Sequence, residues 1–132
     1  MRLALDTGAL IKYLTWDQKT ENNAAVSIIE SADTIIIPTI VLCETVGILK
    51  DLYGVLEQNI IGILQDLTTM PSVEIDRQLV EAGLSLLRSG GDFTLGVILA
   101  EADRAKADHF GSLDQTIAHL SKNFYLLSEK DV

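Results

Sequence analysis

Three aspartates in this sequence stand at positions where a carboxylate can do chemistry. Asp6 directly follows a short apolar run, Asp114 repeats that arrangement near the end of the chain, and Asp92 follows a pair of glycines. Each can equally be the N-cap of a helix, because an aspartate accepts hydrogen bonds from the backbone N–H groups of a first turn. Taken singly, these three residues leave both a structural and a functional interpretation open.

Glu44 is harder to explain as a structural residue. Its neighbours one helical turn away are Ile40, Val41, Gly47 and Ile48, and no lysine or arginine lies within that turn. An ionised carboxylate on an apolar helix face is costly unless it is paired or bound to a metal. A protonated glutamate, or one that reaches solvent at the edge of this face, is the alternative. We interpret Glu44 as a metal ligand or as a group that faces other acids in a polar site.

Considered together, the acids predict a metal site. Asp6 and Asp114 follow the first and fourth predicted strands, and Glu44 is expected to point inward from the helix after the second. If these strands lie near the centre of one sheet, the carboxylates converge, and they then repel one another unless a divalent cation neutralises them. Oxygen ligands without His or Cys select Mg²⁺ or Mn²⁺. Such a site typically performs phosphoryl chemistry.

The elements that must position these acids alternate along the chain. We predict short apolar strands at residues 2–5, 34–37, 73–75, 109–113 and 124–127. Between and around them we predict helices at residues 9–13, 22–31, 38–52, 55–67, 76–88, 92–107 and 114–121. Strands separated by one or two helices favour an α/β fold with a central parallel sheet of about five strands, covered by helices on both faces. In such folds, function gathers beyond the carboxyl ends of the strands.

Composition limits the remaining possibilities. The 132 residues predict a single domain spanning 1–132, and 10 Lys+Arg against 19 Asp+Glu give a formal net charge of −9. That charge disfavours non-specific binding to nucleic acid, so contact with RNA would need cations or a local basic patch. The one cysteine, Cys43, excludes an intramolecular disulfide and fits a reducing, cytoplasmic setting. No apolar run approaches the ~20 residues of a membrane span, so no contact with a membrane is expected.

Four segments resemble the PIN domain family, and most closely its VapC-like toxins. They are Leu-Asp-Thr-Gly-Ala-Leu-Ile-Lys-Tyr-Leu (5–14), Ile-Pro-Thr-Ile-Val-Leu-Cys-Glu-Thr-Val (37–46), Gly-Gly-Asp-Phe (90–93) and Gly-Ser-Leu-Asp (111–114). The resemblance implies an α/β/α sandwich and an Mg²⁺- or Mn²⁺-dependent endoribonuclease. It also implies a homodimer that a small VapB-like antitoxin inhibits. Matched motif by motif, Asp6, Glu44 and Asp114 fall on three acidic positions of the family.

The fourth acidic position departs from the family pattern. Relatives often read Asp-Phe-x-Asp where this chain has Asp92-Phe93-Thr94-Leu95, so Leu95 replaces the usual acid. Asp92 stands one helical turn earlier and is expected either to assist the site or only to cap the helix. Three acids with waters can still hold one ion. A catalytically impaired PIN domain that binds RNA or an antitoxin without turnover is therefore the alternative function.

Several other side chains near these motifs have two interpretations. The hydroxyls of Thr7 and Ser112 could position water or phosphate, or could form local turn bonds. Tyr13 and Trp16 could stack on RNA bases, although packing is the simpler interpretation. His109 and His119 are expected to be structural or surface residues. A receiver domain is disfavoured because only one acid follows the first strand, and a haloacid-type phosphatase is disfavoured because Asp-x-Asp is missing there.

Overall fold

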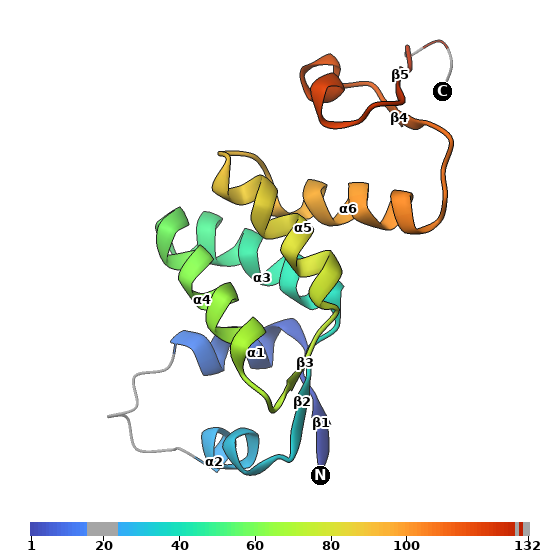
Figure 1. Cartoon of the computed structure of the whole chain (residues 1–132). Helices are drawn as coiled ribbons and strands as arrows, with labels where there is room; N and C mark the ends of the chain where they lie inside the picture. Colours follow the sequence, from blue (N-terminus) through green and yellow to red (C-terminus); the bar gives the residue numbers. More distant parts are fainter. Residues whose placement is uncertain (16–23, 129, 131–132) are drawn as a thin grey trace.

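A three-stranded parallel sheet forms the N-terminal half of the fold. The computed structural model describes residues 1–15, 24–128 and 130. Strands β1 (Arg2–Ala4), β2 (Thr34–Ile36) and β3 (Val73–Glu74) lie side by side in that order, and all are parallel (Figure 1). Ile35 of β2 is the register partner of both Leu3 and Val73, and Ile35 and Val73 are buried. β-Branched residues suit such a buried central strand.

The helices follow the predicted order, and most of their bounds agree with the prediction to within about two residues. They are α1 (Thr7–Thr15), α2 (Ala24–Ser31), α3 (Thr39–Asp51), α4 (Glu57–Thr69), α5 (Arg77–Arg88) and α6 (Phe93–Arg104). Asp76 and Asp92 cap α5 and α6 by accepting from the backbone N–H groups of Leu79 and Leu95. The predicted extension of the last of these helices to residue 107 is wrong, because Lys106 takes a left-handed conformation with φ 59°.

Helices α5 and α6 form a close hairpin at the centre of the molecule. Phe93 is fully buried, and its ring lies against the backbone of Gly83, where a Cβ atom would come within 2.6 Å of it. Gly96 lies equally close to the backbone of α5. Small residues at both positions allow the two helices to approach each other. The hydrophobic core extends from here through α3 and α4 to the sheet.

The C-terminal strands do not join this sheet. Strands β4 (Phe110–Ser112) and β5 (Phe124–Leu126), with the 3₁₀ helix η1 (Gln115–Leu120) between them, form a separate two-stranded parallel sheet beyond the end of α6 (Figure 1). The predicted α/β class with parallel strands is confirmed. The expectation of one central sheet of about five strands, with the first, second and fourth near its centre, is not met, because β4 pairs with β5 in a separate sheet.

No helix within the described ranges combines the length and the apolar character that crossing a membrane requires.

Candidate active site

The first acidic motif meets α3 through a single hydrogen bond. The Thr7 hydroxyl donates to Oε1 of Glu44 over 2.6 Å. Beside it, Oδ1 of Asp6 accepts from the backbone N–H of Ala9 at 2.8 Å, as an N-cap of α1 does. The structure thus brings together Asp6, Thr7 and Glu44 at the carboxyl ends of β1 and β2, where ligands bind in open α/β sheets.

Glu44 is exposed, and the prediction that it points inward on an apolar face is wrong. Helix α3 buries six side chains: Val41, Leu42, Cys43, Thr45, Val46 and Leu49. Glu44 lies on the stripe that stays open, next to Ile40, which is 66 % exposed. The Glu44 carboxylate therefore avoids the cost of burial and remains accessible to a cation or a substrate.

Asp92 and Asp114 both act as caps. Oδ2 of Asp92 accepts from the N–H of Leu95 at 3.1 Å. Oδ1 of Asp114 accepts from the Thr116 hydroxyl at 2.6 Å and from the Thr116 N–H at 2.9 Å. These bonds, that of the hydroxyl first, hold the pKa of Asp114 below its usual value. The capping interpretation of both residues is confirmed, and the bonds keep both carboxylates in fixed positions.

The same two aspartates line one groove. The groove has a volume of about 670 Å³ and lies between the turn that joins α5 to α6 and the segment from β4 to η1. Leu95 lines it together with Asp92 and Asp114, and so does Ser112, whose hydroxyl accepts from the N–H of Asp114 at 3.0 Å. The position that the family resemblance leaves without an acid thus lies in the groove that holds the other two aspartates.

The four predicted site residues form two pairs rather than one cluster. Asp6 and Glu44 are linked through Thr7, whereas Asp92 and Asp114 line the separate groove. Among the residues that the structure describes, no group of three His, Cys, Asp or Glu side chains is arranged to hold a metal ion. The arrangement within one chain therefore does not fit the divalent metal that the sequence predicts.

A buried thiol lies within electrostatic reach of one acid from each pair. Cys43 is buried, as predicted, and burial raises the pKa of its thiol. A hydrogen bond from Thr94 opposes that increase, and the negative charges of Asp92, Glu101 and Glu44 add to it. Asp92 and Glu44 thus both act electrostatically on the Cys43 thiol.

The remaining candidates have structural roles. The Tyr13 hydroxyl bonds to Glu30 at 3.4 Å, and burial and that charge raise its pKa. The Tyr13 side chain packs against the hydrophobic core, which favours packing over base stacking. Trp16 lies outside the described residues. His109 makes an edge-to-face contact with Tyr125 at 6.0 Å between ring centroids. Thr116 is the residue that the sequence analysis missed. An aspartate followed two residues later by a hydroxyl is a turn signal that could have identified it.

Of the comparisons with known proteins, the one with family models gives a match. A family model described as PIN domain matches residues 3–123. No curated protein matches the chain. No solved structure matches it either. The family match includes all four acids and runs over nearly the whole chain. The chain belongs to the PIN domain family, whose members are generally metal-dependent nucleases.

Proposed function

We propose that this chain is an endoribonuclease that depends on Mg²⁺ or Mn²⁺. The observation that carries the proposal is the hydrogen bond between Thr7 and Glu44 beside Asp6, which joins the first two family motifs at the carboxyl edge of the sheet. In hydrolysis, water attacks phosphorus, a carboxylate accepts its proton, and the bond to the leaving oxygen breaks. Because the chain carries a net charge of −9, binding of an RNA phosphate needs cations or a local basic patch.

The test is Mn²⁺-dependent cleavage of a pool of structured RNA by purified protein. We expect cleavage by the natural chain, and its loss in Asp6→Asn and in Glu44→Gln. Asp66→Asn is the matched control, because Asp66 is also an exposed acid and lies on α4, outside the site. Unchanged metal-dependent cleavage by Asp6→Asn would refute the assignment of the site.

We also propose the biological setting that the resemblance to VapC-like toxins implies. The chain acts as the toxin of a toxin–antitoxin pair, forms a homodimer, and is inhibited by a small VapB-like antitoxin. Expression of the chain in bacteria should arrest growth, and Asp6→Asn should abolish that arrest. Co-expression of a small protein encoded beside the toxin should restore growth. Arrest that survives Asp6→Asn would argue against a nuclease toxin.

Leu95 favours a second candidate, a PIN domain that binds RNA or an antitoxin without cleaving. Its apolar side chain lines the groove of Asp92 and Asp114, where it supplies no ligand or proton acceptor. Leu95→Asp distinguishes the two functions. Activity in Leu95→Asp with none in the natural chain would identify a scaffold disarmed at this position, whereas cleavage by the natural chain would exclude that alternative.

A further inference from the structure

The C-terminal unit, defined here as residues 108–128 with β4, η1 and β5, lacks a core of its own. Within the described residues, every buried side chain lies at or before Val97. Leu113, Tyr125 and Leu126 of the unit are 55 %, 56 % and 47 % exposed. A two-stranded sheet is at best marginally stable in water without further packing. The unit therefore needs a surface to cover it.

The first strand offers such a surface. The N–H of Leu5 donates to Ile36, and the carbonyl of Met1 accepts from Thr34, so these two residues, which flank β1, direct their peptide groups toward β2. Peptide groups alternate in direction along a strand, and those of Arg2 and Ala4 consequently point to the opposite edge. No described strand pairs with that edge. An open edge of this kind is a template for another strand.

Strand β4 has the complementary open edge. The N–H of Phe110 donates to Asn123, and the carbonyl of Ser112 accepts from Leu127, so both residues face β5. The peptide groups of Gly111 therefore point outward. A parallel ladder that pairs Leu3 with Gly111 satisfies the open groups of both strands.

That register also aligns the acids. Asp6 follows the last residue of β1 by two positions, and Asp114 follows the last residue of β4 by two positions. Pairing Ala4 with Ser112 places the two aspartates at the same level of adjacent strands, about 5 Å apart along the sheet. Since Thr7 holds Glu44 beside Asp6, the pairing unites three of the predicted metal ligands.

The end of α6 determines where the C-terminal unit begins, and in this structure β4 does not pair with β1 of its own chain. The N–H groups of Lys106 and Ala107 bond to the carbonyls of Asp103 and Ala102 at 3.0 and 3.1 Å, which is a Schellman motif that fixes the exit of the chain. From Ala107, the three Cα steps to β4 span at most about 11 Å.

The end of α6 is also anchored on the wrong side of the sheet. The Arg104 guanidinium binds both carboxylate oxygens of Asp76, at 2.6 and 2.9 Å, just beyond β3. The order β1-β2-β3 puts a strand added to the edge of β1 three spacings away from β3, or about 14 Å. A strand at the open edge of β1 would therefore lie on the far side of β2 from the strand at which the end of α6 is anchored.

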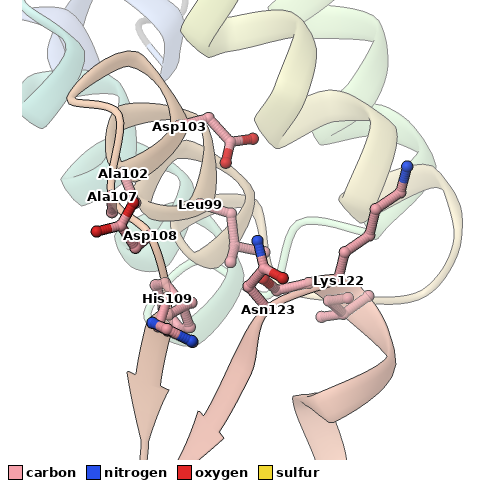
Figure 2. Close-up of a pocket in the computed structure, with 11 residues that line it drawn as sticks. Leu99, Ala102, Asp103, Ala107, Asp108, His109, Lys122 and Asn123 are labelled. Atoms are coloured by element: carbon pink, nitrogen blue, oxygen red, sulfur yellow. The ribbon is translucent and has the colours of Figure 1, made fainter.

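The junction between α6 and the C-terminal unit is itself loosely filled. A cavity of about 420 Å³ lies there. Figure 2 shows the residues around it: Asp103 is on α6, His109 comes just before β4, and Lys122 and Asn123 come just before β5. Apolar side chains, among them Leu99, Phe110 and Leu120, also line this cavity, which leaves part of the junction without close packing. Short, constrained hinges of this kind favour exchange of an element between copies.

We propose that the C-terminal unit pairs with β1 of a second copy, so that each acidic site contains Asp6 and Glu44 of one chain and Asp114 of the partner subunit. The exchange forms a two-fold dimer and explains why one chain alone does not assemble three acids. The inference rests on the proposed function, because it names the partner that completes the same site.

Complementation tests whether the site forms between chains. Asp6→Asn and Asp114→Asn, refolded separately, should each lose Mn²⁺ binding measured by electron paramagnetic resonance. Refolded together, they should recover about one quarter of the natural number of sites, because half of the dimers are mixed and each contains one intact site. Recovery cannot occur if each chain builds its own site. A mixture that binds no more Mn²⁺ than the separate variants, while the natural chain binds it, would refute the exchange.

An engineered disulfide tests the exchange between chains even if the natural chain binds no metal. In the proposed register Ala4 and Ser112 are partners on adjacent strands, a separation that a disulfide spans. Oxidised Ala4→Cys/Ser112→Cys should migrate as a covalent dimer on a non-reducing gel, and Ala4→Cys alone should not. A bridged monomer, or no bridge at all, would overturn the proposal. RNA cleavage plays no part in this readout, so it separates failure of the exchange from failure of the proposed function.

Discussion

Replacement of Gly96 by alanine tests the close contact that sets the position of α6 and its cap Asp92. A Cβ atom at Gly96 would lie 2.6 Å from the carbonyl oxygen of Ala82 and 2.8 Å from Cα of Gly83. An ordinary contact begins at 3.4 Å, so the first approach is 0.8 Å too short. Both neighbouring atoms belong to the backbone, and relief therefore requires the two helices to separate.

The magnitude follows from two opposing contributions. Overpacking of this kind costs about 1–3 kcal/mol, and separation of the helices also loosens the buried ring of Phe93 against Gly83, which favours the upper end. Replacement of a glycine inside a helix by alanine increases stability by about 1 kcal/mol. We expect Gly96→Ala to lower the free energy of unfolding by roughly 2 kcal/mol, or Tm by about 8 °C for a chain of this size.

Urea denaturation followed by circular dichroism measures this change. Gly62→Ala in α4 is the matched control, because a Cβ atom there meets nothing within 4 Å. The control should raise stability by about 0.5–1 kcal/mol through helix propensity alone. If Gly62→Ala behaves in this way and Gly96→Ala is as stable as the natural protein, the α5–α6 contact is not as close as described.

Three further predictions concern charge, burial and the groove. The Arg104 hydrogen bonds lower the pKa of Asp76 from 3.8 to about 2, so their stabilisation is present above pH about 4 and lost as pH falls toward 2. As pH falls across that range, Tm should fall less steeply for Asp76→Asn than for the natural protein. Asparagine can still cap α5, so this comparison isolates the effect of the charge. Thr45→Val should raise stability by about 1 kcal/mol in urea, because the Thr45 hydroxyl is buried without a hydrogen-bond partner among the described residues. Leu95→Asp should increase Mn²⁺ affinity in a titration, since it adds a carboxylate to the groove of Asp92; equal affinity would separate Leu95 from the metal site.

Local chemistry made much of the fold predictable. Pro38 ends a β-branched run and begins a helix, and aspartates at 76 and 92 cap the helices that follow them. These signals act over a few residues, so the sequence contains all of their causes. The sequence does not predict where α6 ends, because Lys106 adopts the left-handed conformation that a glycine usually adopts at the end of a helix.

The sequence predicts which acids belong to the candidate site, but it does not predict how exposed they are. The motifs around Asp6 and Glu44 were recognised separately, and the Thr7 hydroxyl joins them in the structure. The burial of Glu44 was predicted incorrectly because periodicity shows which residues share a helix face, not whether another element covers it. Helix α3 leaves open the stripe that contains Glu44 and Ile40.

The sequence by itself determined the family, the alternation of strands and helices, and the four acids that match the family motifs, because each depends on residue type and short spacing. Only the tertiary structure decided which of those acids meet. That outcome depends on the direction in which the chain leaves α6, which the Schellman motif at Lys106 and the Arg104–Asp76 pair fix together. A contact between residues 28 apart and one left-handed residue have no periodic signature, yet they separate Asp114 from Asp6 within one chain.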